Sequence, residues 1–213
     1  MAPRDYGQWC GITRALELVG ERWALLIIRD LLVGPRRYGE LAGGLPRIPS
    51  NVLAARLKEL QAAGILRRVP RSRVVVYELT PFGRELEPVV LALGAWGFKA
   101  LDEPREEQVV TPDALTMTLR TAFQPQVAAD LPTTAYAARL GSAELLVRVD
   151  GPRLDVTRGD GRVDLAFRAG PGLRRLISGQ LAPESAIATG EVEVLRGRGD
   201  LLARFASTFH LAA

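Results

Sequence analysis

The sequence SNVLAARLKELQAAGILRRVPRSRVVVYEL, residues 50–79, predicts a helix followed by a β-hairpin. Its leucines recur at the spacing that places them on one helical face: Leu53, Leu57 and Leu60. Ser50 and Asn51 are residue types typical of a helix start, and Gly64 is typical of a helix end. We therefore expect a helix over 50–63 that buries its leucine face.

Two short segments rich in β-branched residues, 65–69 and 74–79, follow this helix. Between them lie Pro70, Arg71, Ser72 and Arg73, which are residues that suit a turn. This pattern predicts a hairpin with an arginine-rich tip.

Helical spacing also marks the region before residue 50. The apolar residues at this spacing are Ile12, Leu16, Val19, Trp23, Leu26, Ile27, Leu31 and Leu32. Gly20 interrupts the pattern and Gly34–Pro35 ends it, so two helices are expected, with a short third helix at 38–42. Helix, turn, helix and then a basic hairpin is the order of a winged helix-turn-helix.

After the hairpin, Thr80–Pro81 favours the start of another helix. Its apolar stripe needs a partner and comprises Leu86, Val89, Val90, Leu93, Trp96 and Leu101. Residues 103–110 are polar, charged and contain proline, which is typical of a linker. The predicted domains are therefore 1–102 and 111–213.

The second domain alternates short strands with helices, which predicts an α+β fold for the chain as a whole. A helix is expected after Thr111–Pro112, and a meander of strands follows at 135–140, 144–150, 153–157 and 163–167. The apolar residues at 173–181 indicate a helix, 191–195 a last strand, and 201–209 a closing helix.

The formal net charge of +4 comes entirely from the first half of the sequence. Residues 1–104 hold 15 Lys and Arg against 11 Asp and Glu, whereas residues 105–213 hold 13 of each. Nine basic and two acidic residues lie between Arg36 and Arg73. Such a patch suits a polyanion, although a solvated surface that aids solubility is the alternative.

The face of the 50–63 helix opposite its leucines carries small and polar residues. These are Asn51, Ala54, Ala55 and Lys58, with Ser50 at the N-terminal tip. Small residues allow a helix to lie deep in a DNA major groove, and the polar ones reach base edges or phosphates. The hairpin arginines Arg67, Arg68, Arg71 and Arg73 would contact phosphates or the minor groove, and Arg36 and Arg37 complete the predicted DNA-binding set.

Residues 10–96 resemble the HxlR family of bacterial winged-helix regulators. The resemblance rests on Cys10, Leu16, Gly20, Trp23, the run 31–38 (LLVGPRRY), Glu40, Leu41, Ile48, Leu53, Arg56, Leu57, Leu60, Gly64, the run 77–80 (YELT), Gly83 and Leu86. It implies a homodimer, paired through the first helix and the helix after the wing, on a near-palindromic double-stranded DNA operator. The alternative is that the 86–101 stripe packs only within its own chain.

The sequence from Thr111 onward is similar to the sterol carrier protein domain. The similarity rests on the turn at 159–161 and the runs 164–167 (DLAF), 176–183 (LISGQLAP) and 190–194 (GEVEV). It implies a cavity for a hydrophobic small-molecule effector. Predicted lining residues are Met117, Phe123, Phe167, Leu176, Ile177, Phe205 and Phe209, and the alternative is that they simply fill the core.

Cys10 is the one cysteine in the sequence. The HxlR resemblance implies a sensor of oxidants or electrophiles, which here would act through an intersubunit disulfide or a small-molecule adduct. A small buried hydrophobe at the dimer contact is the alternative.

Little in the sequence supports an enzyme, a metal site or a cofactor. The one histidine, His210, lies near the C-terminus, and a single cysteine cannot form a metal-binding cluster. Apolar runs are short, which argues against a membrane span and, with the absent secretory pattern, predicts a cytoplasmic protein. We expect a DNA-binding regulator, most simply a repressor, and a lipid or small-molecule carrier dimerised by its first domain is the alternative.

Overall fold

A computed structural model describes residues 5–105, 107–159 and 161–212. It divides into two compact units, Met1–Val90 and Leu91–Ala213, and both contain helices and strands. The predicted α+β class is therefore confirmed. Asp160 in the predicted 159–161 turn and Glu106 in the predicted linker lie outside the described residues.

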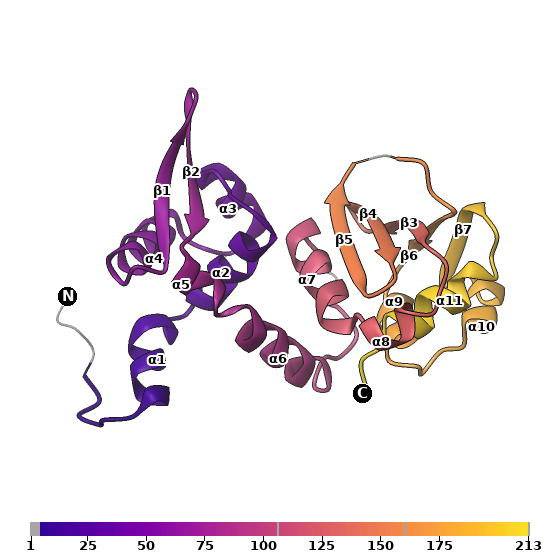
Figure 1. The fold of residues 1–213 in the computed structure, drawn as a ribbon, viewed down its shortest axis with the longest axis horizontal. Coiled ribbons are helices and arrows are strands. Elements are labelled where there is room, and N and C mark those ends of the chain that lie inside the picture. Colours follow the sequence, from indigo (N-terminus) through magenta and orange to yellow (C-terminus); the bar gives the residue numbers. More distant parts are fainter. Residues whose placement is uncertain (1–4, 106, 160, 213) are drawn as a thin grey trace. The chain divides into compact units, whose positions relative to one another are not determined.

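The first unit follows the order of elements that residues 10–96 predict, with one correction (Figure 1). Its elements are α1 (Gly11–Val19), α2 (Ala24–Val33), α3 (Tyr38–Gly44), α4 (Ser50–Ala62), β1 (Leu66–Arg71), β2 (Val74–Leu79), α5 (Pro81–Arg84) and the start of α6 (Glu87–Phe98). The two strands pair antiparallel as a hairpin. The single helix expected after Thr80–Pro81 is two helices, separated by a turn at 85–86, and the second ends before Leu101.

The core of the first unit forms around α2, which buries Ile27, Ile28 and Leu31. Gly83 in α5 lies against the backbone of Ile65, where an added Cβ would be 2.0 Å from the carbonyl oxygen. A side chain does not fit at this distance, so glycine permits the close packing of α5 on the start of the hairpin.

The division between the units falls inside α6 rather than in the 103–110 segment. Phe98 is buried in the core of the second unit, and Ala95 packs against that core. Leu93 and Trp96 of the predicted stripe are exposed, Trp96 at 73%. The end of α6 thus belongs to the second unit, because the helix face that carries Ala95 and Phe98 packs into that unit's core.

The second unit is a five-stranded sheet with helices (Figure 1). Its elements are α7 (Pro112–Ala122), α8 (Pro125–Ala128), β3 (Thr134–Leu140), β4 (Ala143–Asp150), β5 (Arg153–Arg158), β6 (Leu165–Ala169), α9 (Gly172–Ile177), α10 (Pro183–Ala188), β7 (Val192–Gly197) and α11 (Leu201–Thr208). The strand order is β5-β4-β3-β6-β7. Sequence analysis did not identify α8 and α10, and each is a short helix that begins at a proline.

The predicted meander is wrong at its fourth strand, because β6 pairs parallel with β3 instead of adding beside β5. Asp164 fixes this position through two hydrogen bonds with Ala135. Its N–H donates to the Ala135 carbonyl at 2.8 Å, and its carboxylate accepts the Ala135 N–H at 2.8 Å. These contacts join residues far apart in the sequence, so alternation alone could not reveal them.

Candidate nucleic-acid interface

Helix α4 buries the leucine face that its spacing predicts. Leu53, Leu57 and Leu60 are at most 2% exposed. The helix starts at Ser50, as the sequence predicts, with Pro49 at the N-cap position and no side-chain hydrogen bond capping it. Gly64 follows the helix at φ +71°, a conformation that glycine adopts without strain.

The opposite face of α4 is exposed to solvent. It comprises Ser50, Asn51, Ala54, Ala55 and Lys58. The structure therefore brings together all five α4 residues of the predicted DNA-binding set on one accessible surface. Ala54 and Ala55 leave this surface narrow enough to enter a groove.

The hairpin separates its arginines between two faces. Arg67 lies opposite Glu78 in the register, and Arg68 lies opposite Tyr77. The Glu78 carboxylate pairs with Arg67 at 2.7 Å and with Arg71 at 2.8 Å. The hydrogen bond from Arg67, followed by that from Arg71, holds the pKa of Glu78 below its ordinary value. Glu78 thus neutralises part of the charge of both arginines.

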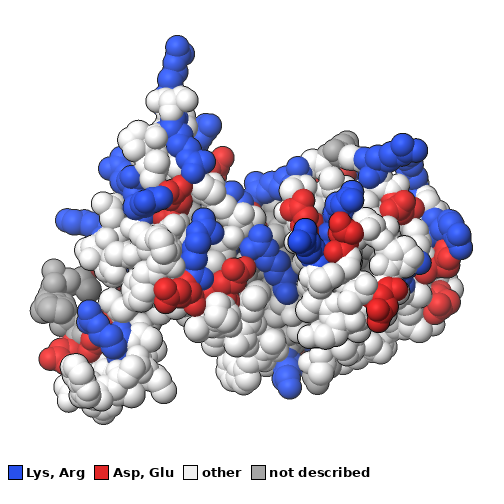
Figure 2. Space-filling view, viewed as in Figure 1, with Lys and Arg blue, Asp and Glu red and all other residues white. Residues whose placement is uncertain are grey.

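The remaining basic side chains of this surface have no carboxylate partner within the described ranges. They are Lys58, Arg68 and Arg73. The Arg68 guanidinium lies over the Tyr77 ring, 6.0 Å from its centroid. Figure 2 shows basic side chains along the hairpin up to its tip. Positive charge that no described carboxylate offsets therefore lies on α4 at Lys58, on β1 at Arg68 and at the hairpin tip at Arg73.

Arg36 and Arg37 occupy different environments. The Arg36 backbone bridges to Tyr77 through hydrogen bonds of 3.0 and 2.7 Å, and its guanidinium donates to the Pro35 carbonyl at 3.0 Å. Arg37 is exposed before α3, and its N–H donates to Glu40. Arg36 consequently helps to hold β2 beside the α2–α3 connection, whereas the Arg37 side chain is accessible.

A pocket of about 510 Å³ lies between α4 and the hairpin. Its lining includes Tyr38, Gln61 and Tyr77, to which sequence analysis assigned no role. Tyr38 and Tyr77 belong to the runs that carry the family resemblance, and that was the available signal. Their proximity depends on the backbone bridge between Arg36 and Tyr77 and could not be deduced from spacing.

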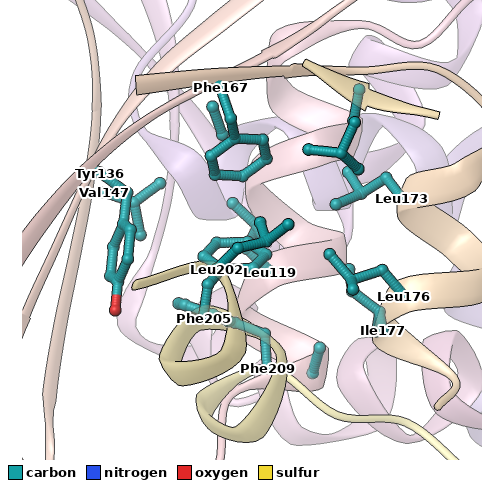
Figure 3. Close-up of a cluster of buried hydrophobic side chains, with 14 of the residues drawn as sticks. Leu119, Tyr136, Val147, Phe167, Leu173, Leu176, Ile177, Leu202, Phe205 and Phe209 are labelled. Carbon is teal, nitrogen blue, oxygen red and sulfur yellow. The ribbon is translucent and has the colours of Figure 1, made fainter. Parts of the chain in front are cut away.

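The predicted effector-lining residues of the second unit pack mostly against one another (Figure 3). The Phe205 ring lies 5.0 Å from Phe167 and 4.6 Å from Phe209, measured between centroids. Leu176 and Ile177 belong to the same cluster, and half-buried Phe123 lies 5.8 Å from Phe209. Met117 is buried on α7 but is not a member of this cluster.

Cys10 immediately precedes α1 and is exposed. Hydrogen bonds from the backbone of Thr13 and then Ile12 lower the pKa of its thiol. Cys10 is thus accessible in the single chain, and its burial at a dimer contact stays a prediction.

No group of three or more His, Cys, Asp or Glu side chains in the described part of the chain is placed to hold a metal ion. Among the described residues, no helix has the length and apolar character that crossing a membrane requires.

Residues 18–105 match the family model described as HxlR-like helix-turn-helix. An HTH-type transcriptional regulator of Mycobacterium tuberculosis is 45% identical over 96 residues, which are 44% of this chain and 60% of that protein. The regulator YdeP of Bacillus subtilis is 34% identical over 101 residues, 46% of this chain and 79% of that protein. The chain thus spans about three fifths of the mycobacterial relative and about four fifths of YdeP.

Solved structures give similar coverage. The oxidized form of the redox regulator HypR is 33% identical, with 44% of this chain and 99% of that chain covered and a TM-score of 0.42. Quinone-bound YodB from Bacillus subtilis is 39% identical, with 41% of this chain and 96% of that chain covered and a TM-score of 0.37. With sequence identity above 30% over most of YdeP, this chain belongs to the HxlR-like helix-turn-helix family.

Proposed function

We propose that this chain is a DNA-binding transcriptional regulator that acts as a homodimer on double-stranded DNA. The observation that carries the proposal is the exposed face of α4, small and polar, beside a hairpin with unpaired basic side chains. In this arrangement α4 enters the major groove, and Arg68 and Arg73 contact the phosphate backbone. As a repressor, it would lower transcription from promoters that overlap its operator.

Exposed apolar residues on α1 and α6 support the dimer. Ile12 is 74% exposed and Leu16 48%, while Val89, Leu93 and Trp96 of the α6 stripe are also exposed. Large apolar side chains left exposed on a helix are typical of an interface. A second copy that covers both helices would also duplicate α4, as a near-palindromic operator requires.

A gel-shift assay with DNA from upstream of the protein's own gene tests the proposal. The full chain is expected to shift a specific fragment, and Ala55→Phe is expected to abolish the shift because the ring obstructs the groove. Ala203→Phe places the same ring on an exposed position of α11 and should leave the shift intact. If the protein were only a carrier, neither the wild type nor Ala203→Phe would produce a salt-sensitive, sequence-dependent shift.

An effector in the second unit remains a prediction of the sterol-carrier resemblance. A hydrophobic ligand there would have to separate rings that contact each other around Phe205. Thermal-shift screening with hydrophobic metabolites tests it, and a complete absence of stabilising compounds would remove the idea.

Thiol-based regulation is the second candidate function, favoured by the exposure and lowered pKa of Cys10. A peroxide would oxidise the thiol, and condensation with Cys10 of a second copy would form an intersubunit disulfide with release of water. If Cys10→Ser retains the same loss of DNA binding under peroxide as the wild type, this candidate fails.

A further inference from the structure

The pocket between α4 and the hairpin combines an apolar base with basic side chains. Helix α4 contributes Ala54, Leu57, Lys58, Gln61 and Ala62 on one side. Arg68 from β1, Tyr77 from β2 and Tyr38 from α3 form the other. A volume of about 510 Å³ lies within the range of pockets that hold small organic molecules.

The two aromatic walls are held in place by hydrogen bonds. The Tyr38 hydroxyl donates to the carbonyl oxygen of Ser50 at 2.8 Å, which ties the ring to the first turn of α4. Tyr77 is fixed by its strand and by the backbone bridge to Arg36. A ligand would therefore meet tyrosine rings whose positions the fold already sets, which lowers the entropic cost of binding.

The charges of the hairpin are distributed in favour of this pocket. Arg67 and Arg71 lie on the face that carries Glu78, which pairs with both. Arg68 lies on the other face, and no Asp or Glu contributes to the lining. Lys58 and Arg68 therefore give the pocket two cations whose charge no carboxylate of the lining offsets.

We propose that this pocket binds a small aromatic carboxylate, with its ring beside Tyr38 and Tyr77 and its carboxylate on Lys58 and Arg68. Each part of the lining suits one part of such a molecule: the alanines and Leu57 accept an apolar edge, and the cations accept the charge. Inorganic phosphate would use only the cations, and a neutral aromatic compound only the rings. Both should bind more weakly.

The regulatory consequence rests on the proposed DNA-binding function. Ala54 and Lys58 belong both to the pocket and to the exposed face of α4 that enters the major groove. A bound aromatic carboxylate occupies this shared surface. It therefore competes with DNA, and the pocket is a site at which a metabolite releases the operator.

Binding of naphthalene-2-carboxylate to the full chain, followed by calorimetry and by the ligand's own fluorescence, tests the inference. We expect saturable binding, with naphthalene-2-carboxamide and inorganic phosphate each weaker by about tenfold or more. Arg68→Gln should weaken naphthalene-2-carboxylate binding by about tenfold. Arg73→Gln, which removes the same charge from the hairpin tip, should leave it unchanged.

A competition arm separates this inference from the proposed function. Naphthalene-2-carboxylate should raise the apparent Kd for operator DNA in proportion to its concentration. If the folded protein binds DNA but not naphthalene-2-carboxylate, or if Arg68→Gln binds it as tightly as the wild type, the pocket inference is overturned and DNA binding stands. If naphthalene-2-carboxylate binding depends on Arg68 but no DNA is bound, the pocket stands and the DNA-binding proposal fails.

Discussion

The first and second units arrange their charged side chains in different ways. On the strands of the second unit's sheet, four of the six arginines lie directly opposite carboxylates in the register: Arg139 and Glu144, Arg148 and Asp155, Arg153 and Asp150, Arg168 and Glu193. The first unit's hairpin has four arginines and Glu78 as its single carboxylate. Cross-strand opposite charges offset one another, so the sheet has little attraction for a polyanion while the hairpin keeps its charge.

The units also differ in where their large apolar residues lie. In the second unit they form a cluster around Phe205, which is fully buried (Figure 3). In the first unit, Trp9, Ile12 and Leu16 remain exposed on and before α1. Leu93 and Trp96, at the end of α6 in the second unit, are exposed as well. The comparison indicates that α1 and the exposed side of α6 offer surfaces to partners, whereas the cluster around Phe205 is complete in its own packing.

The largest expected effect comes from opening the second unit's core. Phe205→Ala removes a ring that contacts Tyr136, Phe167 and Phe209, and should lower the free energy of unfolding by about 3–5 kcal/mol. Urea denaturation followed by near-ultraviolet circular dichroism measures the change. A loss below about 1 kcal/mol would indicate a cluster that is already loosely packed, as an effector cavity would be.

A smaller effect is expected at alkaline pH. Burial raises the pKa of Tyr136 to about 12, whereas an unfolded tyrosine ionises near about 10. Its stabilising contribution is therefore complete below about pH 10 and is lost as the pH rises towards 12, with a cost of about 2–3 kcal/mol. Ultraviolet absorbance should show one tyrosine that ionises only with unfolding, and Tyr136→Phe should remove most of that pH dependence. Ionisation of Tyr136 near about pH 10 in the folded protein, seen as the difference in absorbance from Tyr136→Phe, would contradict the packing described.

The smallest expected effect distinguishes two arginines within the hairpin. Arg67 is paired with Glu78, and Arg73 has no carboxylate partner in the described structure. Arg73→Gln should weaken DNA binding by roughly three- to tenfold at moderate salt, and Arg67→Gln by less than about twofold. Fluorescence anisotropy with a labelled operator measures both. Equal losses would mean that Glu78 does not reduce the charge available to DNA.

The sequence predicted the first unit's elements through the hairpin, but neither the break between α5 and α6 nor how the side chains pair. The Leu53, Leu57 and Leu60 spacing and Gly64 are local signals, and the structure confirms the helix that they predict. The Glu78 pairs depend on strand register, and the pocket depends on the approach of Tyr38 to Tyr77. Both are products of tertiary structure, which residue spacing does not encode.

The same limit explains the second unit. The approximate positions of its strands could be predicted, because β-branched segments and turn residues are local signals in the sequence. The parallel pairing of β6 with β3 requires a crossover that Asp164 fixes against Ala135. The short helix α10 left no periodic pattern to detect in six residues.

The salt dependence of DNA binding by the full chain tests the central claim most directly. Measured by anisotropy, the logarithm of the affinity for operator DNA should fall linearly with the logarithm of salt concentration. Lys58→Gln should reduce the slope by about one, and Arg168→Gln, which removes a paired charge from the second unit, should leave it unchanged. A folded protein that binds no duplex at low salt, or whose slope changes with Arg168 and not with Lys58, would contradict the account.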